Sequence, residues 1–244
     1  MRVKFSPRFV ATFAWFYGWS SVKRGPAWVL SYLAWPLATL FMIYMVSRGR
    51  LVDYALLGGV ISTATSNALS ALGDTAFFRL ELKLQDLLVA ADVSPLEYIA
   101  GVGLGNLIYS FPGLVLFIAL LAALRIVTTA AQWALLALVL LVLVMGASGL
   151  AYLGGSRLSH MRNSWALASF ISIFLTMIPP TYYPYTFLPR PALYALMISP
   201  ATPAAVLLQR LVFDGALDVP LLALFIFENL AYAFLGLALG RWEG

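Results

Sequence analysis

Residues 133–145 read WALLALVLLVLVM, an apolar run without a single charge, and this run decides the class of the protein. It lies within an apolar segment of roughly 20 residues, the length that a helix needs to cross a bilayer core of about 30 Å. Residues 114–124 form a second uncharged run. Of the 244 residues, 62% are apolar and only 10% are charged, whereas about a quarter of a soluble domain is charged. The sequence therefore predicts an all-α, polytopic membrane protein.

Six spanning helices can be placed on the apolar segments. They are expected at residues 26–46, 54–73, 98–124, 131–154, 164–180 and 219–240. With the N-terminus inside, ten of the 15 Lys and Arg residues fall in cytoplasmic segments and five in outer ones. Positive charge collects at cytoplasmic helix ends, so we expect a cell-membrane protein with both termini in the cytoplasm. The net charge of +5 then reflects orientation and does not indicate a nucleic-acid partner.

The N-terminal segment, residues 5–24, predicts an amphipathic helix lying in the membrane interface. Aromatic residues recur on one side at helical spacing, and Lys23 and Arg24 close the segment before the Gly25-Pro26 break. Aromatic residues with flanking positive charge suit the headgroup layer. The alternative is an irregular start to the first spanning helix. A removable signal peptide is not expected, because no small-residue cleavage site follows a compact apolar core.

The connection between the second and third predicted helices favours a short helix along the cytoplasmic surface, residues 79–91. Leucines recur on one side at helical spacing, at Leu80, Leu84, Leu87 and Leu88. Polar side chains fall largely on the other side, at Arg79, Glu81, Lys83, Gln85 and Asp86. Such a helix is either a lever for a soluble partner or a surface linker without one, and the pattern alone does not separate the two.

The third helix has a predicted start and a predicted packing face. Ser94 suits its N-cap and Pro95 its first turn. Gly101 and Gly105 lie one helical turn apart and permit close packing against another helix. These glycines cannot cradle a nucleotide, because no strand precedes them and no Lys-Ser/Thr pair follows.

The connection between the fifth and sixth predicted helices, residues 181–218, is dense in proline and aromatic residues. The prolines divide it into pieces too short to cross a membrane. Irregular backbone exposed to lipid is not tolerated, so residues 184–212 predict two half-helices that dip back into the outer leaflet. Its high apolar content argues against a disordered loop.

These two connections resemble those of a known family. Residues 84–101, LQDLLVAADVSPLEYIAG, are similar to the coupling-helix region of type-2 ABC transporter permeases, the group that includes drug and polysaccharide exporters. Residues 182–211, YYPYTFLPRPALYALMISPATPAAVLLQRL, resemble the outer half-helices of the same family. The chain departs from the family pattern where Asp92 replaces a proline and Ser199 an asparagine. The order of the motifs extends the resemblance over essentially the whole chain.

The resemblance implies the membrane-spanning subunit of an ATP-driven exporter of an amphiphilic drug, lipid, glycolipid or peptide. It implies pairing with a second permease, in a homodimer or a heterodimer, and with two copies of a separate ABC ATPase that binds ATP and Mg. This chain has no Walker-type motif, no acid–base pair and no metal cluster within its helices. It is therefore not expected to be an enzyme or to hold a cofactor or a metal of its own. A nucleotide-independent channel or a scaffold remains the alternative.

The same resemblance implies roles for particular residues. The ATPase would dock on the 79–91 helix and the next cytoplasmic loop, at Arg79, Glu81, Lys83, Gln85, Asp86, Arg157, His160 and Arg162. The substrate path would be lined by the second and fifth helices, between the two permeases. The outer half-helices would form an exit gate, with an aromatic seal made by Tyr182, Tyr183, Tyr185 and Phe187.

Glu228 and Asn229 lie in the middle of the sixth predicted helix. An ionised carboxylate there costs roughly 2.5–3.5 kcal/mol on insertion scales, so it should face protein or water or be protonated. One interpretation is a group that lines the transport path or holds a proton. The other is a hydrogen bond to a polar group on another helix, such as Asn67 or Asn106.

Overall fold

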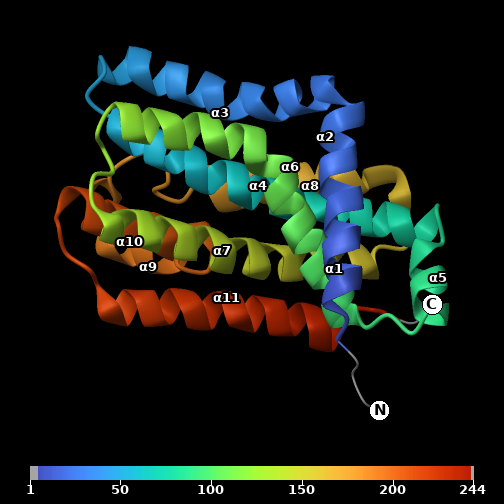
Figure 1. Ribbon diagram of the computed structural model, residues 1–244. Helices are drawn as coiled ribbons and strands as arrows, with labels where there is room; N and C mark the ends of the chain where they lie inside the picture. Colours follow the sequence, from blue (N-terminus) through green and yellow to red (C-terminus); the bar gives the residue numbers. More distant parts are fainter. Residues whose placement is uncertain (1–4, 243–244) are drawn as a thin grey trace.

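The computed structural model describes residues 5–242, and all regular structure in that range is helical (Figure 1). In chain order the elements are α1 (Pro7–Ala14), the π-helical turn η1 (Trp15–Trp19), α2 (Ser20–Arg24), α3 (Pro26–Ser47), α4 (Val52–Leu80), α5 (Leu84–Ala90), α6 (Pro95–Ala123), α7 (Ala130–Arg157), η2 (Met161–Asn163), α8 (Ser164–Met177), η3 (Tyr185–Phe187), α9 (Arg190–Leu196), α10 (Ala201–Phe213) and α11 (Val219–Leu239). The all-helical fold class is confirmed.

Four helices in the described range are long and apolar enough to cross a membrane: α4, α6, α7 and α11. They contain the second, third, fourth and sixth predicted spans and indicate a membrane protein. The first predicted span corresponds to α3, whose described apolar stretch is Leu33–Ser47. The fifth corresponds to α8, with 14 residues. A helix of that length is roughly 21 Å long, short of the bilayer core of about 30 Å.

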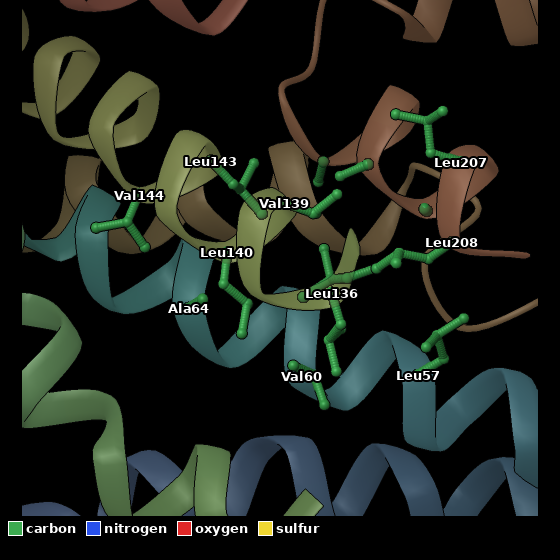
Figure 2. Close-up of a cluster of buried hydrophobic side chains, with 14 of the residues drawn as sticks. Leu57, Val60, Ala64, Leu136, Val139, Leu140, Leu143, Val144, Leu207 and Leu208 are labelled. Carbon is green, nitrogen blue, oxygen red and sulfur yellow. The ribbon is translucent and has the colours of Figure 1, made fainter. Parts of the chain in front are cut away.

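Helix α4 lies at the centre of the bundle, with α3, α6, α7, α8 and α10 packed around it. Leucines and valines of α4, α7 and α10 interlock to form the main core (Figure 2). Small residues let the neighbours approach closely. A Cβ atom added at Gly59 would lie 2.3 Å from the ring of Phe117 on α6. The packing of α6 against α4 therefore depends on the missing side chain.

Helix α4 runs further than the predicted 54–73 span, to Leu80. No glycine or proline interrupts residues 74–80, so nothing there ends the helix. The chain breaks at residues 81–83, where Lys83 has a left-handed backbone conformation with φ 51°. The predicted 79–91 helix is therefore only α5, Leu84–Ala90, and Arg79 belongs to α4.

The start of α6 matches its prediction. The Ser94 hydroxyl accepts a hydrogen bond from the Glu97 backbone N–H, the Glu97 carboxylate accepts one from the Ser94 backbone N–H, and Pro95 occupies the first turn. The predicted N-cap is thus confirmed as a complete capping box.

The N-terminal segment forms a helical rod, from α1 through η1 to α2, that ends before Gly25. The rod crosses the direction of the bundle near the end where α5 and the C-terminal residues lie (Figure 1). Its aromatic side chains pack on α6 at the two predicted glycines. A Cβ atom at Gly101 would lie 2.9 Å from Phe13, and one at Gly105 would lie 2.5 Å from Tyr17. The expected close packing at both glycines is confirmed.

Helices α9 and α10 form a hairpin at the opposite end of the bundle. The turn between them reaches inward, where the Ser199 hydroxyl donates to the Leu175 carbonyl and the Tyr232 hydroxyl to the Ile198 carbonyl. Helix α10 then returns, and its Phe213 ring lies 4.2 Å from that of Tyr54 near the start of α4. Residues 201–209 are all buried. We call the two ends of the bundle the α5 end and the hairpin end.

Candidate functional site

A groove of about 260 Å³ opens between α3, α4 and α8. Seven of the twelve residues that line it carry a hydroxyl or an amide: Thr63, Ser66, Asn67, Ser70, Ser169, Ser172 and Thr176. Trp35, Pro36, Trp165, Ala168 and Ile173 complete the lining, so these twelve residues include no ionisable side chain. The groove combines uncharged hydrogen-bonding groups with an apolar and aromatic wall.

Several of the polar groups in the groove are held by their own helices. Ser70 donates to the Asn67 carbonyl at 2.7 Å, and Thr176 donates to the Ser172 carbonyl at 2.6 Å. The Asn67 amide donates to Ser110 of α6 at 2.7 Å. Within the described range, the buried Thr63 hydroxyl has no partner. Hydroxyls bound in this way keep acceptor lone pairs for a molecule in the groove.

Trp165 closes the groove toward the α5 end. Its ring lies on the backbone of Gly73, where an added Cβ atom would be 2.2 Å away. The Trp165 indole N–H also points to the Asp74 carboxylate at 3.5 Å, and the Tyr17 hydroxyl donates to the other oxygen of Asp74. Asp74 thus joins the N-terminal rod, α4 and α8 at one point. Sequence reasoning missed Asp74 because the second span was ended at residue 73, which left this acid in a loop.

The exposed side of α5 only partly matches the predicted docking surface. Glu81, Lys83 and Asp86 are exposed as expected. Their neighbours in the sequence, Leu82 and Leu87, are 53% and 65% exposed. The surface therefore presents apolar as well as charged side chains, and the prediction that Leu87 lies on the side opposite the exposed charges is wrong.

Gln85 and Arg79 are corrections to the predicted docking surface. Gln85 is only 5% exposed, and its amide N–H₂ donates to the carbonyls of Arg241 and Trp242. The Arg79 guanidinium donates to the Leu158 carbonyl from the end of α4. The prediction treated residues 79–91 as one helix, whereas the turn at Lys83 changes which side of α5 faces the bundle. Both side chains bond to neighbouring segments, with Gln85 buried and Arg79 half-buried.

The second predicted docking segment lies beside the end of α4. Arg157, His160 and Arg162 are exposed, and the bond from Arg79 to Leu158 ties this loop to α4. Arg157 also donates to the Leu239 carbonyl, from Nε at 3.0 Å and Nη2 at 2.7 Å. At the α5 end, the structure thus brings this loop and the end of α4 together.

The four aromatic residues predicted as an exit gate occupy different environments. Tyr182 is buried and hydrogen-bonds Ser62 of α4, and burial raises the pKa of its phenol to about 12. Tyr183 donates to the Ile178 carbonyl at 2.6 Å. The backbone N–H of Tyr185 donates to Gln209 at 3.0 Å, and Phe187 is 65% exposed. The three tyrosines thus hold the chain after α8 at separate points, and the role of the four residues in an exit gate stays a prediction.

Gln209 of α10 binds the chain segment after α8 at several points and was not identified from the sequence. Its side chain is 2% exposed and donates to the carbonyls of Pro180 at 2.6 Å and Tyr183 at 3.1 Å. Its carbonyl oxygen accepts the bond from Tyr185. A lone amide inside the apolar α10 sequence was the available signal, since a buried polar group needs partners.

The polar residues of α11 have partners other than those predicted. Asn229 is fully buried and donates to the Phe225 carbonyl of its own helix at 2.9 Å. Glu228 shares a hydrogen bond with Tyr232, whose hydroxyl donates to Ile198 at the hairpin turn. In the part of the chain that the structure describes, the buried Glu228 Oε1 has no partner. The predicted partners Asn67 and Asn106 lie elsewhere, around α4 and the rod.

Comparison with known proteins found no matching family model, no matching curated protein and no matching solved structure.

Proposed function

We propose that this chain is the permease subunit of an ABC transporter, exporting an amphiphilic drug, lipid, glycolipid or peptide with a separate ATPase that binds ATP and Mg. The observation that carries the proposal is that one helix, α4, joins two features. Its middle lines the polar groove, and its end leads through the turn at Lys83 into α5. A displacement of α5 by a soluble partner would therefore act on the helix that lines a candidate substrate path.

The proposed placement in the cell membrane puts the α5 end and both termini in the cytoplasm. The hairpin α9–α10 would then enter from the outer side as two half-helices. Its turn lies beside Tyr232, 13 residues into α11, which is a depth of roughly 20 Å. Burial of α10 among α4, α7 and α11 supports this, since irregular backbone within a membrane must be covered by protein. In this proposal α3 is the first span, α8 together with residues 178–180 forms the fifth, and the rod lies in the interface.

The groove supports an amphiphilic substrate. Its hydroxyl and amide groups can bind a polar headgroup, while Trp35 and Trp165 offer apolar surface to a chain or ring. The groove opens beside exposed aromatic side chains of α8, including Phe170 and Phe174, which are 66% and 50% exposed. A second permease would cover this side, in a homodimer or a heterodimer, so that the path lies between the two copies.

Co-purification tests the proposal. The chain is tagged, native membranes are solubilised in mild detergent, and the partners are identified by mass spectrometry. We expect a stoichiometric soluble protein with Walker motifs. Its absence in several detergents, with nucleotide present, would favour a nucleotide-independent channel or a scaffold instead.

A charge exchange on α5 tests the docking surface. Lys83→Glu combined with Asp86→Lys reverses two exposed charges, and we expect it to weaken retention of the ATPase without affecting membrane insertion. Arg50→Glu combined with Asp53→Lys is the matched control, because it reverses two exposed charges with the same spacing at the hairpin end. Equal retention in the two double variants would contradict the assignment of α5 as the docking surface.

A further inference from the structure

The last described residues, 239–242, are fixed by side chains of α5 and α7. Three carbonyls and one N–H of this short segment are hydrogen-bonded to side chains of α5 and α7. Arg157 donates to Leu239, and the Arg241 N–H donates to Ser156 at 3.1 Å. The Arg241 carbonyl accepts from Tyr152 at 3.1 Å and from Gln85 at 2.9 Å, and the Trp242 carbonyl accepts from Gln85. The chain that leaves α11 is thus held through its backbone.

The Trp242 side chain adds an aromatic anchor to these bonds. Its ring centroid lies 5.3 Å from that of Tyr98 and 6.4 Å from that of Tyr152. Tyr98 and Tyr152 also contact each other, at 5.7 Å. Both belong to a buried apolar cluster that includes Leu88 of α5. The segment therefore connects α5, α6 and α7.

Helix α5 has little else to hold it in place. It has seven residues, too few to be a stable helix alone. Left-handed residues flank it, Lys83 with φ 51° and Asp92 with φ 57°, so both of its connections turn sharply. Its buried residues are Gln85 and Leu88. The position of α5 therefore depends on the apolar contacts of Leu84 and Leu88 with this cluster and on the amide of Gln85.

We propose that residues 239–242 are a clasp that fixes α5 to the bundle, with Gln85 as the positioning residue. The clasp begins at the last residue of α11 and is bound to α7. A force on α5 is consequently passed to α7 and α11 as well as to α4, and is not lost in the turns at Lys83 and Asp92. The importance of the clasp for transport rests on the proposed function, in which α5 receives the motion of the ATPase. The effect of the clasp on the position of α5 does not require the ATPase.

Gln85 suits this role because its amide donates to two carbonyls. Gln85→Leu keeps a side chain of similar size but leaves both carbonyls without that donor. Gln85→Lys keeps a donor at this position, one atom further from the backbone and positively charged, from which both carbonyls can accept. Removal of the Trp242 ring by Trp242→Ala weakens the clasp from its other side. Both side chains hold residues 239–242, so both losses should release the same helix.

Hydrogen–deuterium exchange of the purified chain in detergent, followed by mass spectrometry, measures the release. We expect Gln85→Leu and Trp242→Ala each to speed exchange in residues 84–90 by about tenfold, while the centre of α4 stays protected. Gln85→Lys should restore slow exchange. The matched control is Gln132→Leu at the hairpin end, because Gln132 is also a buried glutamine that donates to a backbone carbonyl, that of Leu211. It should leave α5 unchanged.

The outcomes separate this proposal from its alternatives. Unchanged exchange of α5 in both Gln85→Leu and Trp242→Ala overturns the clasp. Exchange of α5 that is equally fast in Gln132→Leu also overturns the clasp, because it would show a general loss of stability. If either the leucine or the alanine variant does not fold, Gln85→Met decides, because it keeps the length of the side chain but removes the donor to both carbonyls. A clasp requires faster exchange of residues 84–90 in this variant, and unchanged exchange overturns it. No ATPase is present in this experiment, so its result is independent of the co-purification.

Discussion

Helices α4 and α11 are both long and apolar enough to cross a membrane, but they occupy opposite environments. An 18-residue apolar stretch of α4 has a mean hydropathy of 1.3 and is 89% buried inside the protein. That of α11 is more apolar, at 1.9, but is only 17% buried. The less apolar helix is thus the more buried one. In a water-soluble protein the more apolar helix is expected inside, because burial removes it from water.

The difference between these helices shows where the polar groups of the bundle are placed. The centre of α4 buries Ser62, Thr65 and Asn67 against its neighbours. The outward side of α11 presents large apolar side chains, including Phe227 and Phe234, which are 72% and 66% exposed. Lipid is as apolar as leucine, so packing and interhelical hydrogen bonds hold such a bundle together. Substitutions on α4 should therefore cost far more than matched substitutions on α11.

The largest difference in stability between variants of α4 and α11 is expected from substitutions that add side-chain volume. A Cβ atom at Gly58 of α4 would lie 2.2 Å from the Thr181 carbonyl oxygen, a backbone atom that no rotamer change can move. Gly58→Val should destabilise the protein by about 3 kcal/mol or prevent folding, because overpacking displaces the 178–184 segment. Ala223→Val adds volume on the exposed side of α11 and should cost little. Thermal unfolding in detergent with size-exclusion chromatography compares them, and similar behaviour would refute the central position of α4.

A smaller difference in stability between the two helices is expected from substitutions that remove side-chain volume. Leu69 of α4 is 1% exposed, and Leu230 of α11 is 51% exposed. Leu69→Ala leaves a cavity and should cost roughly 2 kcal/mol, at the low end for soluble cores because the transfer term is weak in lipid. Leu230→Ala should change stability by less than about 0.5 kcal/mol. The melting temperatures of the two variants in detergent measure this difference in stability. A larger loss for Leu230→Ala would indicate that α11 is covered by another protein surface.

The helical segments were predictable from the sequence because apolar runs, caps and breaks act locally. The six apolar segments all fall on helices, and Ser94 caps α6 as its residue type and spacing predict. The Gly25-Pro26 break separates the rod from α3. These features depend on neighbouring residues alone, and one sequence contains that information.

The functional surfaces were less predictable, because they depend on how helices are rotated against each other. Periodicity separates the two sides of α5, but the turn at Lys83 decides which side meets the bundle, and so Gln85 was placed outside. Asp74 was missed because hydropathy ended the span before the helix itself ended. Gln209 was missed because its partners are backbone carbonyls 26 and 29 residues away. Every residue has a backbone carbonyl, so a sequence does not show which carbonyls accept a hydrogen bond from a side chain.

A small effect on stability is expected at Glu228, which lies beside Asn229 in the middle of α11. Glu228→Gln preserves the side-chain outline and can still bond Tyr232, so the free energy of unfolding should change by less than about 1 kcal/mol. Tyr232→Phe is the companion variant. It removes the donor to Ile198 at the hairpin turn and should cost roughly 0.6 kcal/mol. Thermal unfolding in detergent measures both changes.

Activity then separates the two interpretations of Glu228. A structural residue predicts that Glu228→Gln leaves the ATPase activity of the co-purified complex, and its pH dependence, as in the parent chain. A carboxyl group that moves a proton or lines the path predicts lost activity with unchanged stability. The structural interpretation is expected, because the carboxyl group is bonded within its own helix and lies outside the lining of the groove. On this interpretation α11 acts as a wall that packs on α7 and contacts the hairpin, and it takes no part in the groove between α3, α4 and α8.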